Sequence, residues 1–411
     1  MKKFIFLLLP ALLLSQDLKS LLELAQQNNN LLKSSQISVS SKEKELDSAQ
    51  NNYYPTLDAN AFYKRDDDPT PFFPGTTYGA AAKLSFDIYD GGKKSYTKKQ
   101  KNEEVSAAKF SHEANTKSMF LNITKAFYNL KSLYSSLDAR EEASKAVKAQ
   151  LQRMQAFYDA KLATSDDVDR LQSAYDRNIY AMESLKFQIL SLKKSLELQV
   201  GTPITRLENS TFKKLLTQES SELDSILALR SNKKALKNLS ETIDSYYYPN
   251  ITLEDTYTLY GYQDKPTFGG QVIEQLDKQN TIMATLNLRV LDFGVLREQK
   301  EAIKLQADAL HEQIIYKSKE QKMQLELSRK RIQTAELNIK SSRSALKAAT
   351  SALKTITKKY NAGIVDNVVY LDALSSHTEA KALYEKSLND LEIAYAIHYY
   401  YHSKNLKEYL Q

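Results

Sequence analysis

The stretch Leu84-Ser85-Phe86-Asp87-Ile88-Tyr89-Asp90-Gly91-Gly92 recurs 202 residues later as Leu286-Asn287-Leu288-Arg289-Val290-Leu291-Asp292-Phe293-Gly294. Two shorter pairs accompany it: Tyr54-Pro55-Thr56-Leu57 with Tyr248-Pro249-Asn250-Ile251, and Tyr158-Asp159-Ala160-Lys161-Leu162 with Tyr360-Asn361-Ala362-Gly363-Ile364. Each copy holds a helix, two short alternating segments and a very long helical hairpin, in that order. The duplication predicts rotational pseudo-symmetry, for which a tube is the obvious architecture.

This repeat sets the expected organisation of the chain. The first repeat spans 16–206, a linker spans 207–218, and the second repeat spans 219–411. In the first repeat we expect a helix over 17–52, strands at about 53–64 and 78–89, and a helical hairpin at about 94–200. In the second we expect a helix, strands at about 250–260 and 281–291, and a hairpin at about 296–408.

The N-terminus carries a secretory signal. Met1-Lys2-Lys3 is a positive segment, residues 4–14 are apolar, and Ser15 offers a small residue for cleavage. Residues 1–15 are therefore expected to be a signal peptide, too short to span a bilayer permanently. With no cysteine in the chain, disulfides, thiolate metal sites and lipidation are excluded. The exported protein is expected in the periplasm or the outer membrane.

The composition is typical of long helices rather than of a nucleic-acid-binding protein. Glycine and proline are scarce, at 10 and 8 residues, whereas Lys, Leu, Ala, Ser, Glu and Gln are abundant. The lysine surplus is spread along the helices, where it indicates a solvated face. No nucleic acid is expected among the partners.

The four short segments alternate between apolar and polar residues. Within 78–89, for example, Leu84, Phe86 and Ile88 lie on one side, and Ser85 and Asp87 on the other. Strands of this kind match lipid-facing staves of a barrel with a wet interior. The alternative is a small soluble sheet with one face on a core. In 250–260, Asp255 interrupts the apolar side.

Four strands cannot close a barrel alone, and open edges in hydrocarbon leave backbone groups unpaired at several kcal/mol each. The barrel is therefore expected to close by oligomerisation. Two copies would give eight strands, whose interior is filled by side chains, whereas three copies would give twelve and leave an aqueous lumen.

The hairpins carry a sustained 4-3 spacing of apolar and small residues, which is the pattern of coiled-coil packing. The segment 94–158 alone would reach roughly 100 Å as a helix at 1.5 Å per residue. The two series, which keep the offset of 202, are Leu133, Leu137, Arg140, Ser144, Val147, Leu151, Met154, Tyr158 and Ala335, Ile339, Ser342, Leu346, Ala349, Leu353, Ile356, Tyr360.

Taken together, the Tyr-Pro pairs, the strand exits 90–92 and 292–294 and the hairpin turns 158–168 and 360–373 resemble the TolC family of outer-membrane efflux proteins. The resemblance covers the whole mature length. It implies a mainly α fold with a small membrane β-barrel portion: long hairpins forming a trimeric α-barrel, and four strands per protomer in a twelve-stranded β-barrel. It also implies a homotrimer that works with a periplasmic adaptor protein and an inner-membrane pump of the RND or ABC type.

The resemblance further implies a gate where the second hairpin narrows the tunnel. Its expected residues are Asp372, Val369, Tyr360 and Asp167. A ring of three Asp372 carboxylates would repel anions and attract cations; the alternative is a solvated or helix-capping carboxylate. Family members pair an acid on the first turn with a base on the second, but Val365 stands where the base is expected. That ion pair is therefore in doubt here.

The hairpin turns are also the expected docking surface for the adaptor, since apolar residues lie at an exposed tip. Lys161 replaces the glycine of the other copy and is expected to alter its turn. Ordinary turn packing is the alternative reading. The expected docking residues are Leu162, Ala163, Thr164, Gly363, Ile364 and Val365.

The sequence offers no recognisable enzymatic chemistry. His398 and His402 are four residues apart on a predicted helix, but no third ligand completes a metal site at helical spacing. Gly91-Gly92-Lys93-Lys94 lacks the full spacing of a phosphate-binding loop. We therefore expect no enzyme, metal or cofactor. The predicted function is a passive exit duct of a tripartite efflux or type I secretion system; the alternative is a coiled-coil tether without a pore, in the periplasm or at the surface.

Overall fold

The computed structural model describes residues 16–68, 70, 74–216, 219–263, 265 and 267–411, so the predicted signal peptide at 1–15 lies outside the described residues. The chain divides into two compact units. One, the helical unit, contains the described residues up to Gln36 with Ser111–Ser225 and Lys317–Gln411. The other, the sheet unit, contains Ile37–Phe110 and Ile226–Tyr316.

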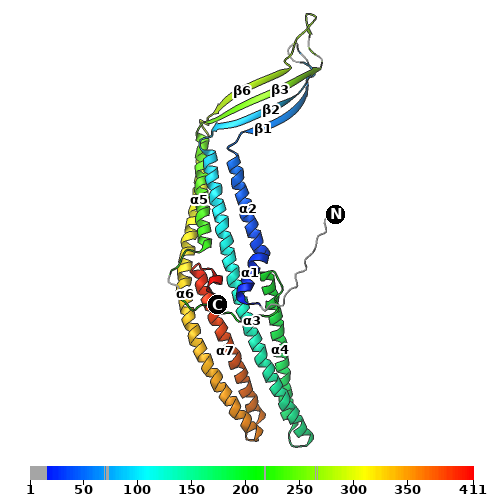
Figure 1. Cartoon of the computed structure of the whole chain (residues 1–411), viewed down its shortest axis with the longest axis vertical. Helices are drawn as coiled ribbons and strands as arrows, with labels where there is room; N and C mark the ends of the chain where they lie inside the picture. Colours follow the sequence, from blue (N-terminus) through cyan, green and yellow to red (C-terminus); the bar gives the residue numbers. More distant parts are fainter. Residues whose placement is uncertain (1–15, 69, 71–73, 217–218, 264, 266) are drawn as a thin grey trace. The chain divides into compact units, whose positions relative to one another are not determined.

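The sheet unit is built on four antiparallel strands in the order β1-β2-β3-β6 (Figure 1). A two-stranded ribbon, β4 with β5, lies in the loop between β3 and β6. The strands are β1 (Thr56–Arg65), β2 (Thr76–Tyr89), β3 (Asn250–Gln263), β4 (Thr267–Phe268), β5 (Gln271–Val272) and β6 (Lys278–Asn287).

The duplication is visible in the pairing of the strands. The first hairpin aligns Thr56 of β1 with Ser85 of β2, and the second aligns Asn250 of β3 with Asn287 of β6. Adding 194 to the β1 position and 202 to the β2 position converts the first pair into the second. Both copies therefore form their hairpin in the same register.

The sheet turns its apolar side outward. Leu84, Phe86 and Ile88 of β2 are 43%, 38% and 55% exposed, whereas Lys83, Ser85 and Asp87 between them are partly covered. On the covered side, Lys83 forms an ion pair with Glu254 at 2.7 Å, and the Thr252 hydroxyl donates to Asp87 at 2.9 Å. The soluble-sheet alternative requires the apolar side to lie on a core. In the described part of the chain, this sheet does not meet that requirement.

Seven helices make up most of the described chain, so the prediction of a mainly α fold with a small antiparallel sheet is confirmed. They are α1 (Leu18–Asn28), α2 (Asn30–Asn51), α3 (Lys93–Asp159), α4 (Ser165–Val200), α5 (Asp224–Asp244), α6 (Val295–Asn361) and α7 (Asn367–Tyr401); short 3-10 turns follow at Ser245–Tyr247 and Leu406–Tyr409.

The single helix expected over 17–52 is wrong, because the chain breaks at Asn29 into α1 and α2. Asn29 adopts an extended backbone, and its side-chain oxygen accepts from the amides of Leu31 and Leu32 at 2.8 and 3.0 Å. Its amide nitrogen donates to the Gln199 carbonyl at 2.6 Å. Asparagine competes for backbone hydrogen bonds in this way, and so it starts a new helix.

The strand exits that identified the repeat act as helix caps. The Asp90 carboxylate accepts from the amides of Gly92 and Lys94 at 3.0 and 2.8 Å, at the start of α3. Asp292 does the same for Gly294 and Leu296 at the start of α6, both at 3.0 Å. Each carboxylate satisfies one amide of the first helical turn and the amide of the residue just before the helix.

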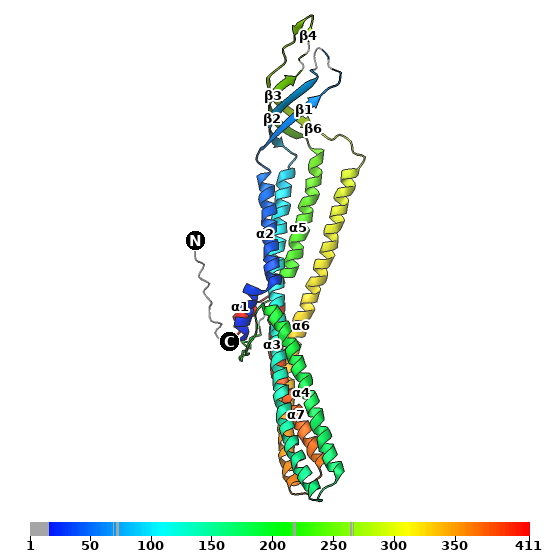
Figure 2. The ribbon, with the colours of Figure 1, turned by 90° about the vertical axis from the view of Figure 1, so that its right-hand side faces the viewer.

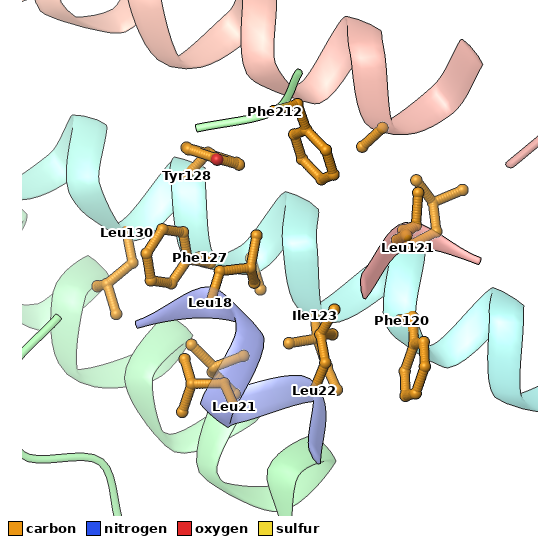
Figure 3. Packing of buried hydrophobic residues seen from close by; sticks show 14 of the residues in the cluster. Leu18, Leu21, Leu22, Phe120, Leu121, Ile123, Phe127, Tyr128, Leu130 and Phe212 are labelled. Atoms are coloured by element: carbon orange, nitrogen blue, oxygen red, sulfur yellow. The ribbon is translucent and has the colours of Figure 1, made fainter. Parts of the chain in front are cut away.

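The main core of the helical unit is formed where α1 packs against the middle of α3 (Figure 3). Leu18, Leu21 and Leu22 are fully buried there, in contact with Phe120, Ile123 and Phe127 of α3. Their spacing places the leucines on one face of α1, as the sequence predicts. None of the described helices combines the length and the apolar character that crossing a membrane requires.

Candidate functional site

The two long hairpins, α3 with α4 and α6 with α7, end in turns of the same geometry. Lys161 and Gly363 are equivalent in the repeat and both have a left-handed backbone, with φ of 62° and 74°. In the first turn the amide of Leu162 donates to the Phe157 carbonyl, and in the second that of Ile364 donates to the Lys359 carbonyl. Lys161 therefore does not alter its turn, although a residue with a Cβ is strained in this conformation.

In each turn a polar side chain caps the start of the second helix. The Thr164 hydroxyl accepts from the Asp167 amide at 3.4 Å to start α4, and the Asp366 carboxylate accepts from the Val369 amide at 3.0 Å to start α7. Threonine and aspartate are both favoured at this position, because a side-chain oxygen reaches an unpaired amide.

The turns of the two hairpins lie at the same end of the helical unit (Figure 2). Hydrogen bonds join them. The side-chain amide of Asn367 donates to the carboxylate of Asp167 at 3.1 Å and to its backbone carbonyl at 3.2 Å. Asn367 is only 2% exposed. A second contact joins Arg153 of α3, as donor, to the side-chain oxygen of Asn361 of α6, at 2.9 Å. We call these two contacts the tip bridges.

Asn367 and Arg153 were not among the residues predicted from the sequence. A signal for Asn367 was present, because it precedes the buried Tyr370 and Leu374 by three and seven residues, on the same helical face. A polar residue on an apolar stripe requires a buried partner, which the structure shows to be Asp167. Arg153 gave no comparable signal, since it lies among exposed residues.

A small apolar cluster lies next to the tip bridges. Tyr370 and Leu374 of α7 pack with Leu171 of α4 and Val147 of α3, and Tyr360 of α6 is packed at the margin. The rings of Tyr360 and Tyr370 stack with centroids 4.9 Å apart. Burial raises the pKa of both tyrosines, so they stay neutral at physiological pH.

The structure brings together only part of the expected gate. Tyr360 and Asp167 both lie at the junction of the two hairpins, and Asp167 is among the charges that raise the Tyr360 pKa. Asp372 is exposed and Val369 is 41% exposed. Among the described residues Asp167 forms no ion pair; its hydrogen bond from Asn367 takes that place.

The expected docking residues lie at the ends of the turns. Leu162 and Ile364 are 77% and 70% exposed, so each hairpin presents one large apolar side chain at its tip. Ala163 and Val365 are partly covered, Thr164 is used as a helix cap, and Gly363 supplies the left-handed backbone.

The histidine pair on α7 lies away from the turns. His398 and His402 are buried with ring centroids 4.1 Å apart, and Nδ1 of His398 lies 3.0 Å from the Ser328 hydroxyl. Within the residues that the structure describes, no group of three or more His, Cys, Asp or Glu side chains is placed to hold a metal ion.

The fold is similar to that of solved bacterial outer-membrane channels. The CmeC channel of Campylobacter jejuni has a TM-score of 0.82 at 14% identity, covering 94% of this chain and 85% of that one. The outer membrane protein VceC of Vibrio cholerae has 0.80 at 15%, covering 95% and 96%. The open state of the MtrE channel of Neisseria gonorrhoeae has 0.79 at 15%, covering 95% and 89%. At these identities the likeness establishes the fold, and the predicted TolC-like fold class is confirmed.

A family match in the first half of the chain agrees with this fold. Residues 21–198 match the family described as "Outer membrane efflux protein". No curated protein is significantly similar to the chain in sequence. The resemblance drawn from the repeated motifs is thus confirmed, and a general role as an efflux channel is supported. Outer membrane efflux proteins form a family of channels, not of enzymes.

Proposed function

We propose that this protein is the outer-membrane duct of a tripartite efflux or type I secretion system, through which substrates leave passively. The observation that carries the proposal is the sheet with an exposed apolar face and a polar reverse side. Lipid is the solvent in which such a face is stable, and a polar reverse side suits a water-filled lumen. Two very long hairpins in the same chain supply the tunnel.

The active form is a homotrimer in this proposal. Four strands leave two open edges, and three copies supply the twelve strands that enclose an aqueous lumen. The barrel lies in the outer membrane, unlipidated because the chain has no cysteine, and the tunnel extends into the periplasm. We also propose the division into repeats 16–206 and 219–411, which the shared hairpin register supports.

The hairpin tips form the gate and the docking surface. Asp372 and Val369 face the tunnel axis of the assembled trimer, while Tyr360 and Asp167 lie at the junction that must loosen for opening. Exposed Leu162 and Ile364 contact the adaptor together with Ala163, Thr164, Gly363 and Val365. The adaptor in turn links the duct to an RND or ABC pump, which supplies the energy.

The competing function, a coiled-coil tether, needs no amphipathic strands and predicts a soluble protein without conductance. Extraction in detergent, mass determination and planar-bilayer recording separate the two. We expect a trimer that conducts ions. A soluble monomer without conductance would refute the duct.

The gate assignment has its own test. Replacing Asp372 with Ala removes three carboxylates from the axis, so block of the channel by divalent cations should weaken, while Asp169→Ala, at another exposed acid of the tip region, should leave it unchanged. Unchanged block in Asp372→Ala would remove Asp372 from the gate but leave the duct intact.

A further inference from the structure

The two outer strands of the sheet each have a single neighbour in the described chain. β1 pairs only with β2, and β6 pairs only with β3. Open edges of this kind bind further strands, and the proposed trimer requires such a strand. Any pairing of these edges between copies rests on that proposed assembly. The assembly alone does not say which residues meet where two copies join.

We infer that β6 of one copy pairs antiparallel with β1 of a second copy, in a register fixed by the internal duplication, with Leu286 opposite Ala61. The junction between the repeats inside one chain is the template, since there β2 pairs with β3 and Leu84 faces Asp255. Adding 202 to a β2 position gives the equivalent position of β6, and subtracting 194 from a β3 position gives that of β1. These two shifts convert the junction within the chain into the one between copies. The same two shifts already relate the two hairpins that the structure shows.

This register places apolar residues against apolar residues. Besides Leu286 with Ala61, it sets Leu288 opposite Ala59 of the second copy. All belong to the exposed apolar side of the sheet. A slip by one residue would turn one strand's apolar set to the polar face, which excludes the odd registers.

Charge selects among the remaining registers. On the polar side the inferred pairing places Arg289 opposite Asp58 of the second copy, at the positions equivalent to Asp87 and Thr252, which bond to one another within the chain. Asp58 forms no ion pair among the described residues. A slip by two residues would set Asp58 opposite Asn287 or Leu291 instead. Opposite charges that face each other across two strands stabilise the pair.

The early end of β6 agrees with this interface. A strand to about 291 was expected, but β6 stops at Asn287 because its neighbour β3 begins at Asn250. β2 reaches Tyr89 because β3 pairs with its last residues from the other side. Residues 288–291 correspond to that extension, and β1 of the second copy would pair with them.

Cysteine cross-linking tests the register directly, because the chain has no cysteine of its own. The double variants Leu286→Cys/Ala61→Cys and Asn287→Cys/Asn60→Cys place one pair on each face, so one of them is the non-hydrogen-bonded pair with the closer side chains. Their matched controls within the chain are Leu84→Cys/Asp255→Cys and Ser85→Cys/Glu254→Cys. The control that oxidises shows on which face the side chains are close enough to link. The pair between copies on that same face should then give covalent dimers and trimers.

The slipped pair Leu286→Cys/Ala59→Cys should cross-link several-fold less. Stronger linking of the slipped pair, linkage only within monomers, or no linkage while a control oxidises would each overturn the register. The mass of the unsubstituted protein in detergent is measured alongside. A monomer there refutes the proposed assembly itself, whereas a trimer with the wrong links refutes only the register.

Charge reversal supplies a second measurement that does not depend on disulfide geometry. Asp58→Arg or Arg289→Asp alone places like charges opposite each other at all three junctions between copies. Each variant should therefore lower the temperature at which the trimer dissociates. The double reversal should restore it. Equal losses in the single variants with no recovery in the double would contradict the Asp58–Arg289 contact.

Discussion

The buried side-chain amide of Asn367 donates to the carboxylate of Asp167 at 3.1 Å, so the start of α7 is tied to the start of α4. The side-chain oxygen of Asn367 is also buried and has no hydrogen-bond partner among the described residues. This amide is thus one of the two tip bridges that hold the hairpins together at their ends, where the proposed gate must move. It stands where we looked in the sequence for an ion pair between Asp167 and a base at position 365.

Removing this contact should loosen the tips. In Asn367→Ala the partly covered Asp167 carboxylate loses the bond from Asn367 and keeps the one from the Thr164 hydroxyl at 3.0 Å, so the expected cost is that of one hydrogen bond, about 1 kcal/mol. We expect a larger single-channel conductance and faster hydrogen exchange in the turns. Asp169→Asn, which removes an exposed charge from the same helix, is the control. Conductance that is identical in Asn367→Ala and the control would show that the bridge does not restrain the tips.

The strained turn of the first hairpin predicts a stabilising change. Lys161→Gly removes the steric cost of a left-handed residue and should stabilise the turn by about 1 kcal/mol. Gly363→Lys in the other copy should destabilise its turn by a similar amount. Hydrogen exchange of the turn amides measures both effects, and opposite signs in the two copies are the diagnostic result.

The two equivalent helix caps at the strand exits, Asp90 and Asp292, should each contribute to stability by a similar amount. Asp90→Ala and Asp292→Ala should each cost about 1 kcal/mol, since each leaves two amides at the start of a helix without their side-chain acceptor. Asparagine retains one acceptor oxygen, so Asp90→Asn and Asp292→Asn should cost less. Thermal melts in detergent give the comparison. Alanine variants as stable as the wild type would contradict the capping role.

Glu392 on α7 predicts a pH dependence of stability. Its side chain is 7% exposed and accepts from the Phe212 amide at 2.7 Å, and burial raises its pKa above the ordinary 4.5. The folded state therefore favours the protonated form. The resulting stabilisation is fully present below about pH 4.5 and is lost as the pH rises through the folded pKa.

Glu392→Gln should remove this component, because the amide keeps the acceptor but does not ionise. The variant should melt at a higher temperature than the wild type above that transition, and its melting temperature should vary less with pH. Glu326→Gln, at an exposed position, is the control. Parallel pH profiles for wild type and Glu392→Gln would show that Glu392 does not cause the dependence.

The periodicities of the sequence were sufficient to predict the fold class, because long apolar series determine which face packs. They did not predict the break at Asn29, where one side chain competes with the helix for backbone amides. They also placed the end of the last strand near 291. In the structure β6 ends at Asn287, because its partner β3 begins at Asn250 and offers no further residue for pairing.

The candidate site was less predictable than the fold. Asp167 lies at the junction of the hairpins, where its partner is Asn367. That partner depends on contact between distant segments, which no local spacing specifies. The roles proposed for Asp372 and Val369 depend on a threefold axis that a single copy does not contain. They remain predictions for the assembled protein.

The outward apolar face of the sheet also bears on how the protein is made. A newly exported protomer would carry Leu84, Phe86 and Ile88 through water, beside two strand edges open to any extended peptide. Such a surface aggregates unless it is covered soon after synthesis. Association of the three chains and entry into lipid should therefore be coupled, and the free protomer should be the form most exposed to chaperones and proteases.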